Sequence, residues 1–251
     1  STQAKTLFPY TTLFRSGDSI QFMRYIALVA GLAKQVFYSL PAPIVPLVTR
    51  LPDNCRRLES SEAMPPLDFA CSLVSLPMAM GTTLQSIPAA VPYVHVEPAL
   101  VEKWRQRLGP KRGVRVGLVW SGNATYSADQ HRSIPLEMLR AAAPADVQFV
   151  SLQKEIRDSD LPAVAAWPSF IHVGDEQGSF ADAAALACLV DVVITVDTSV
   201  GHMTGALARP WWVMLAHCAD WRWMLDRDDS PWYPSVRLFR QNAPGQWESV
   251  I

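Results

Sequence analysis

The most regular hydrophobic pattern in the chain is a run of apolar, mostly β-branched residues at 189–196 that stops at a polar turn. A continuous run of this length suits a strand buried on both faces of a parallel sheet. Asp197 ends the run, and Thr198 and Ser199, which are good helix-capping residues, precede a stretch of small residues. The pattern predicts a strand, a turn and a helix. At the carboxyl end of a parallel strand, such a turn presents backbone N–H groups to an anion, so we expect phosphate binding there.

Further strands and helices alternate along most of the remaining chain. The same criteria predict strands at 35–40, 68–73, 114–120, 147–153, 170–174, 210–215 and 237–241, and helices at 19–30, 43–50, 98–108 and 180–186. This alternation is typical of an α/β fold with doubly wound parallel sheets. A proline-spaced connector precedes residue 96, and we expect two domains there, 17–96 and 97–251.

Composition narrows the function classes. The 251 residues are 49% hydrophobic, which is enough for a substantial core, and the net charge of −1 gives no electrostatic reason to expect nucleic acid as a partner. The four cysteines are far apart and form no C-x-x-C pair, so neither a metal site nor a disulfide framework is predicted. No segment is long enough for a transmembrane span, and no signal peptide is evident. We therefore expect a cytoplasmic protein without a metal or cofactor.

Two motifs in the second predicted domain carry a resemblance to a known family. V-D-T-x-x-x-H occupies 196–202, and W-S-G-N at 120–123 is followed by D-x-x-R-S-I-P-L at 129–136. These motifs resemble GT-B glycosyltransferases of the ADP-heptose:lipopolysaccharide heptosyltransferase type, and more closely their relatives that follow tetratricopeptide repeats in bacterial proteins. The resemblance implies two Rossmann-like domains facing across a cleft. It also implies a hexosyl- or heptosyltransferase with a nucleotide-diphosphate sugar as donor, a glycan or protein as acceptor, no metal, and repeats upstream in the full-length protein.

Carried over residue by residue, the resemblance assigns donor binding to Ser121, Gly122, Asn123, Arg132, Gln153, Asp182, Asp197, Thr198, Ser199 and His202. Simpler interpretations stay open for several of these residues. The Asp197 turn is also explained as an ordinary helix cap, with His202 as a packed core histidine. Arg132 is also explained as a structural partner of Asp129, and Asp182 as a carboxylate at a helix start.

The first predicted domain carries the acceptor side of the resemblance. Residues 17–25 match G-D-[ST]-x-Q-F-x-R-Y, in which the aspartate is the proposed catalytic base, so Asp18 would take the proton of the acceptor hydroxyl. Asp18 is equally suited to start a helix. Residues 75–83 resemble an S-L-P-x-x-x-G-T-T loop at the cleft, which implies an acceptor role for Gly81, Thr82 and Thr83; the alternative is a loop shaped only by proline and glycine.

Two further segments, residues 1–16 and 226–228, affect the interpretation. Residues 6–16 can be read as a translated sequencing-adapter oligonucleotide, so we interpret 1–16 as a non-native leader that replaces the family's first strand. We therefore expect weak activity or none; a divergent natural segment is the alternative. Asp226-x-Asp228 is not interpreted as a metal motif, because no strand precedes it and its neighbours are aromatic.

Two other functions remain open: a nucleotide-sugar-binding module without transfer, and a nucleotide-sugar epimerase.

Overall fold

The C-terminal part of the protein is built on one parallel sheet of six strands. The computed structural model describes residues 15–59 and 61–251. Its larger sheet has the order β5-β4-β3-β6-β7-β8. The strands are β3 (Arg115–Val119), β4 (Gln148–Ser151), β5 (Phe170–His172), β6 (Val192–Val196), β7 (Trp211–Leu215) and β8 (Val236–Arg240). The chain adds strands outward in one direction from β3 and then in the other from β6, so the β3–β6 boundary is the switch point where such sheets bind ligands.

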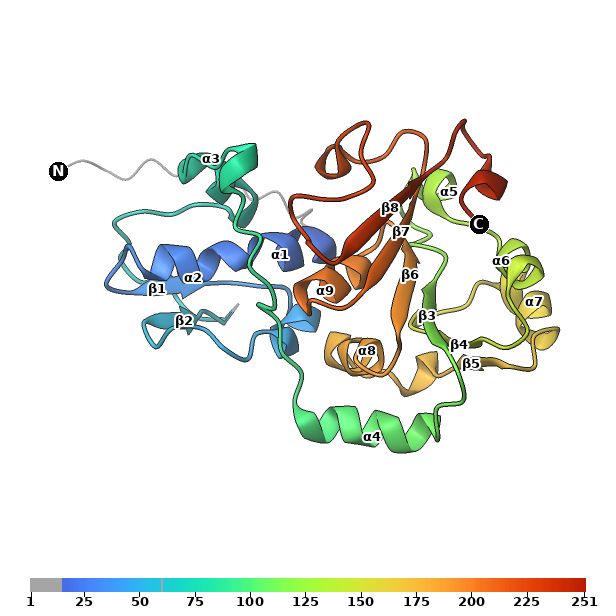
Figure 1. Cartoon of the computed structure of the whole chain (residues 1–251). Helices are drawn as coiled ribbons and strands as arrows, with labels where there is room; N and C mark the ends of the chain where they lie inside the picture. The colour runs from blue at the N-terminus through green and yellow to red at the C-terminus, as the bar shows by residue number, and fades with distance from the viewer. Residues whose placement is uncertain (1–14, 60) are drawn as a thin grey trace.

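Helices cover both faces of this sheet (Figure 1). α8 (Phe180–Ala187) and α9 (Ser199–Ala206) lie on the face toward the N-terminal half, whereas α6 (Leu136–Ala142) and α7 (Leu161–Ala165) lie on the other. α4 (Pro98–Leu108) packs on α8 and buries Trp104 completely. The small side chains of α8 and α9 let these helices approach the sheet closely, and each face has its own cluster of buried apolar residues.

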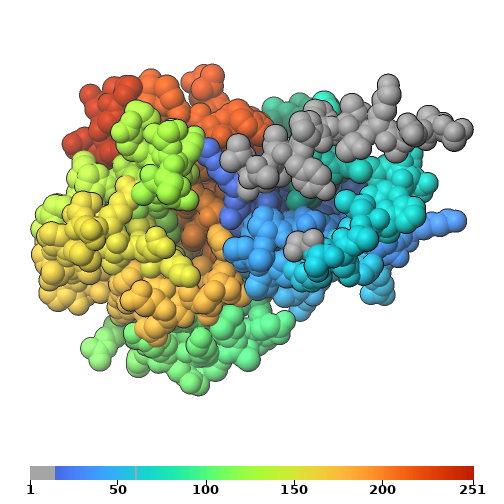
Figure 2. All heavy atoms as spheres, turned by 180° about the vertical axis from the view of Figure 1, so that it is seen from behind, coloured from blue at the N-terminus to red at the C-terminus, as the bar shows by residue number. Residues whose placement is uncertain are grey.

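The N-terminal half is smaller and has a two-stranded parallel sheet, β1 (Val36–Tyr38) with β2 (Cys55–Arg57). Its α-helices are α1 (Ser16–Phe22), α2 (Arg24–Ala30) and α3 (Leu76–Ala79), and its short 3-10 helices are η1 (Ala42–Leu47), η2 (Leu73–Ser75) and η3 (Leu84–Ser86). Helix α1 packs against α9 of the other half. From behind, the surface is hollowed between the blue atoms of the N-terminal half and the yellow-green atoms of the C-terminal half (Figure 2).

The remaining short elements belong to the C-terminal half. They are α5 (Asp129–Arg132), η4 (Asp158–Asp160), η5 (Gly174–Glu176), η6 (Trp221–Trp223) and η7 (Trp247–Ser249). No helix in residues 15–59 and 61–251 has the length and apolar character needed to cross a membrane.

Predicted elements of the C-terminal half are confirmed, and three in the N-terminal half need correction. The helix predicted at 19–30 is two helices that meet at Met23. The helix predicted at 43–50 is a 3-10 helix, in which Pro46 cannot donate the backbone hydrogen bond of an α-helix. The strand predicted at 68–73 is absent: Phe69 is 93% exposed, so this apolar run lacks a sheet to pack on. The predicted leader, residues 1–16, lies outside the described residues except for Arg15 and Ser16.

Candidate functional site

The two predicted donor loops meet at the carboxyl ends of β3 and β6. These strands are neighbours in the sheet, with Val119 opposite Thr195, so the residues that follow each strand lie side by side. Arg132 connects the loops directly, because its Nη1 donates a 2.7 Å hydrogen bond to the main-chain oxygen of Asp197. Residues separated by 65 positions in the sequence therefore form one surface at the switch point of the sheet.

The loop after β3 is held in place by Gln153, one of the predicted donor-binding residues. Gln153 Oε1 accepts hydrogen bonds from the N–H groups of Ser121 (3.1 Å) and Trp120 (3.3 Å), and its Nε2 donates to Ser121 Oγ at 2.7 Å. Asn123 Oδ1 accepts from the N–H of Thr125 at 2.9 Å and closes a local turn. Gln153 and Asn123 thus fix the conformation of the loop.

Arg132 belongs to a network centred on a buried carboxylate. Asp129 is 3% exposed and accepts hydrogen bonds from Arg132 Nε (2.9 Å), Ser133 Oγ (2.8 Å) and Arg157. Burial raises the pKa of Asp129, but the hydrogen bonds from Arg157, Ser133 and Arg132 outweigh it and lower the pKa overall. The pairing of Arg132 with Asp129, an alternative left open by the sequence, is present, and it orients the guanidinium.

Gly122 lies against this network and leaves no room for a side chain. A Cβ atom there would be 2.2 Å from Arg132 Nη2 and 2.3 Å from Asp129 Oδ1. Arg132 Nη2 makes no hydrogen bond to any residue within the described ranges. The Nη2 group, with its two cationic N–H donors, thus remains for an anion beside the main chain of Gly122.

The turn after β6 begins α9 as predicted. Thr198 has extended backbone angles at the N-cap position and Ser199 is the first helical residue, so the first N–H groups of the helix end at this turn. Burial raises the pKa of Asp197, while the neighbouring Trp223 indole and the charges of Arg222 and Arg132 lower it in part. The Trp223 Nε1 and Thr198 Oγ1 atoms are buried here without a hydrogen-bond partner among the described residues.

His202 is a packed histidine inside this half, which is the simpler of its two interpretations. It is 2% exposed, its ring stacks on Trp223 at a centroid distance of 5.6 Å, and its Nδ1 lies 2.9 Å from the Tyr233 hydroxyl. Its Nε2 is 3.8 Å from Asp197 Oδ1. Burial, and secondly the positive charges of Arg222 and Arg24, hold the pKa of His202 well below its ordinary value, so the ring is neutral. The neutral ring lies next to Asp197 in the interior of this half.

Asp18 reaches the same place from the N-terminal half. It lies in the first turn of α1, and a Cβ atom on the preceding Gly17 would be only 2.9 Å from His202 Cδ2 and 3.6 Å from Ser199 Cα. The absence of a side chain at Gly17 therefore lets α1 contact the start of α9. Asp18 Oδ1 accepts a 2.6 Å hydrogen bond from Arg222, which follows β7.

The predicted acceptor loop lies on α1 and α2. The Thr82 hydroxyl is 3.0 Å from the Tyr25 hydroxyl, and Thr83 forms the N-cap of η3 together with Ser86. Gly81 has φ of +61°, a conformation that favours glycine. The Tyr25 contact holds the loop on α2, the helix that follows the one carrying Asp18, and this position agrees with an acceptor role.

Asp182 is the one predicted donor residue whose carboxylate is fully engaged elsewhere. Its Oδ1 accepts from Trp104 Nε1 at 2.9 Å, and its Oδ2 accepts from the N–H groups of Gly178 and Ser179 at 3.0 Å each. These contacts favour the alternative of a carboxylate that fixes the start of α8. They explain the residue without a ligand.

The structure adds three charged or polar residues that were not assigned to the site. Arg157 joins the Asp129 network, Arg222 pairs with Asp18, and Tyr233 bonds to His202. Arg222 and Tyr233 lie within the aromatic segment 220–234. Its tryptophans differ in burial: Trp223 is fully buried, whereas Trp221 is 63% exposed.

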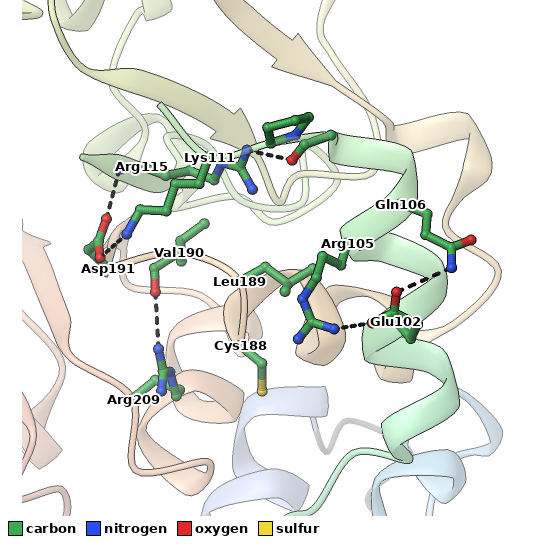
Figure 3. A pocket seen from close by; sticks show the side chains of 12 residues that line it. Glu102, Arg105, Gln106, Lys111, Arg115, Cys188, Leu189, Val190, Asp191 and Arg209 are labelled. Atoms are coloured by element: carbon green, nitrogen blue, oxygen red, sulfur yellow. Dashed lines mark hydrogen bonds and ion pairs between the residues drawn. The ribbon is translucent and has the colours of Figure 1, made fainter. Parts of the chain in front are cut away.

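Two other places in the molecule have features of a site. Among the described residues, no group of three His, Cys, Asp or Glu side chains is arranged to hold a metal, and Asp226-x-Asp228 belongs to no such group. A cavity of about 720 Å³ lies beside Arg115 and Asp191, where β3 and β6 begin (Figure 3). The Asp197 turn lies at the opposite end of β6. The cavity's cations already have partners in the protein: Lys111 pairs with Asp191, Arg105 with Glu102, and Arg209 donates to the main chain of Val190. Arg209 Nε is buried there without a hydrogen-bond partner among the described residues, but no predicted donor or acceptor residue lines this cavity.

Comparisons with known proteins agree with the fold. No protein-family model matches the chain. Protein FlbA of Caulobacter vibrioides is 27% identical over 193 residues, which cover 73% of this chain but 32% of FlbA, so the chain spans about a third of that relative. The structure of E. coli ADP-heptose lps heptosyltransferase II is similar with a TM-score of 0.58 at 14% identity, covering 95% of this chain and 92% of that one. The predicted fold class, a GT-B arrangement of α/β halves with parallel sheets, is thereby confirmed.

Proposed function

We propose that the protein is a glycosyltransferase that moves a sugar from a nucleotide-diphosphate donor to a hydroxyl of a glycan or protein acceptor. The observation that carries the proposal is the meeting of three elements at one place. The Asp197 turn with the N-terminus of α9 and the Arg132 guanidinium provide donors for phosphate, and Asp18 approaches from the other half. The fold shared with a heptosyltransferase supports this interpretation.

Each group has a role that follows from its position. The backbone N–H groups at the start of α9 and the free Nη2 group of Arg132 stabilise the diphosphate as negative charge develops on it. The acceptor hydroxyl gives its proton to the Asp18 carboxylate, and the acceptor oxygen forms a bond to the anomeric carbon of the sugar. The bond from that carbon to the diphosphate oxygen breaks, and its electron pair leaves with the nucleotide diphosphate.

The proposal includes two finer statements that rest on the sequence resemblance. The reaction proceeds without a metal, because positive charge for the leaving diphosphate comes from Arg132 and the helix N-terminus. The chain is the glycosyltransferase part of a longer protein with tetratricopeptide repeats upstream. Its coverage of a third of FlbA is in keeping with a longer parent protein.

The experiment is a combined binding and turnover assay. UDP, ADP and GDP are titrated first, and a binding nucleotide raises the melting temperature because it stabilises only the folded state. Sugar derivatives of the binding nucleotide are then incubated with the protein and candidate acceptors. Transfer or donor hydrolysis supports a glycosyltransferase, saturable binding without turnover supports a binding module, and an altered sugar still joined to nucleotide supports an epimerase. If none of the three nucleotides binds, the proposal fails.

A further inference from the structure

Arg222 joins the two halves of the chain at the proposed catalytic aspartate. It lies in η6, and its Nη2 atom is 2.6 Å from Asp18 Oδ1, 204 positions away in the sequence. The side chains of Arg222 and Asp18 are 11% and 19% exposed. Because bulk water is largely excluded from both groups, their attraction is stronger than that of a surface ion pair.

The guanidinium of Arg222 has more donors than its contacts use. Arginine carries five N–H donors, and Arg222 makes one side-chain hydrogen bond within the described residues, to Asp18. Its Nε is buried without a hydrogen-bond partner, and the nearest carboxylate oxygen to it, Asp220 Oδ1, is 3.5 Å away. A planar guanidinium with free donors suits an anion that offers several oxygens, such as a diphosphate.

Arg222 also lies close to the donor side of the site. Its positive charge counteracts the effect of burial on the pKa of Asp197, and it adds to the effect of burial on the pKa of His202. The start of α1 contacts the start of α9 through Gly17 and Ser199. The guanidinium is therefore within electrostatic reach of both Asp18 and the turn proposed to hold the diphosphate.

The segment that carries Arg222 contains unusual backbone. Met224 and Asp226 have φ angles of 55° and 52°, which side chains other than glycine rarely adopt. Residues held in such conformations cluster at ligand sites and at segments that switch between two arrangements. This observation is independent of the ion pair and agrees with a segment that changes its contacts when a ligand binds.

The ion pair has a chemical consequence for the base. While this pair persists, Asp18 Oδ1 is engaged by the hydrogen bond from Arg222 and is not available to an acceptor hydroxyl. We propose that Arg222 is shared between Asp18 and the donor diphosphate. Without donor it pairs with Asp18, and with donor bound it moves to the diphosphate and frees Asp18 to accept the proton of the acceptor. This inference rests on the proposed function, and it means that the base becomes effective only when the donor is in place.

A double-mutant cycle tests this sharing. Dissociation constants for UDP, ADP and GDP are measured by calorimetry for wild type, Asp18→Asn, Arg222→Gln and the double variant. Sharing predicts that Asp18→Asn tightens binding several-fold, because the nucleotide no longer competes with the carboxylate for Arg222. Arg222→Gln weakens binding by roughly 10-fold, the scale of one charge-assisted hydrogen bond. In the Arg222→Gln background, Asp18→Asn has no further effect.

Controls separate sharing from a purely structural role. Arg222→Lys keeps the charge and restores part of the affinity, while Arg140→Gln removes a solvent-exposed arginine paired with Glu137 and leaves affinity unchanged. The corresponding nucleosides, which lack phosphate, bind all variants alike. If Asp18→Asn weakens nucleotide binding or leaves it unchanged, the sharing of Arg222 is overturned and the proposed function still stands. Failure of all three nucleotides to bind wild type overturns both.

Discussion

Asp129→Asn is the most direct test of how Arg132 and Arg157 are held beside the proposed phosphate site. The Asp129 carboxylate accepts hydrogen bonds from Arg132, Arg157 and Ser133 in a setting that is 3% exposed. Asparagine has the same shape, but its amide nitrogen is a donor and faces an arginine N–H without an acceptor. The variant thus loses at least one charge-assisted hydrogen bond and leaves a guanidinium without its counter-charge.

The magnitude follows from the number of contacts and their exposure. Each charge-assisted hydrogen bond contributes about 1.5–3 kcal/mol. Water offsets part of the loss, because the Arg132 and Arg157 side chains are 19% and 32% exposed. We therefore expect Asp129→Asn to lower the free energy of unfolding by about 2–4 kcal/mol, below the 3–5 kcal/mol typical of breaking a fully buried pair.

Urea denaturation at pH 7 measures this difference, with Glu137→Gln as the matched control. Glu137 accepts two hydrogen bonds from Arg140 on the exposed surface of α6, so its loss has little effect on stability. If Asp129→Asn unfolds at the same urea concentration as Glu137→Gln, the network does not hold Arg132 in the way described and the reasoning is refuted.

The pH dependence provides a second check on Asp129. Its pKa in the folded protein lies below its ordinary value of 3.8, so the folded state favours the ionised form. The contribution of Asp129 to the free energy of unfolding is complete above its ordinary pKa. It is lost as the pH falls through the lower pKa that Asp129 has in the folded protein. The difference in stability between wild type and Asp129→Asn should therefore shrink below about pH 4 and stay constant above about pH 5.

Four further predictions concern function and pH. Arg132→Ala should weaken nucleotide-diphosphate binding by about 1.5–3 kcal/mol in calorimetry, and unchanged affinity would contradict its phosphate role. Asp18→Asn should lower transfer by about 10²–10⁴-fold although it does not weaken nucleotide binding, which the sharing of Arg222 predicts to tighten; a fully active variant would remove Asp18 as the base. His202, whose folded pKa is lowered, should make stability fall as the pH drops below about 6.5, and a denaturation series from pH 7 to 5 should show a smaller slope for His202→Gln. A chelator should leave transfer unchanged, whereas a metal-reversible loss would return attention to Asp226 and Asp228.

The sequence alone determined most of the C-terminal half. The apolar run before Asp197 and the buried run at 114–120 are strands, as short apolar runs rich in β-branched residues and bounded by turn residues are expected to be in a doubly covered parallel sheet. The helix predicted at 98–108 has the same bounds in the structure, where Pro98 begins it and Gly109 ends it. The N-terminal half was harder to predict, because its short apolar segments fit a strand, a 3-10 helix or a loop equally well until their packing is known.

Motif spacing also located the Asp197 turn and the Arg132 loop, but only the tertiary structure decided what each side chain does there. Gln153 and Asp182 were predicted to contact a ligand, yet their oxygens are taken by backbone and indole donors that lie next to them only after folding. The contact between Arg222 and Asp18 could not be predicted, because the two residues are 204 positions apart in the sequence and no local pattern encodes a contact between two halves of a chain. Local sequence specifies strands, caps and turns through short-range sterics and hydrogen bonding, whereas partners of charged side chains are chosen by the packing that brings α1 against α9.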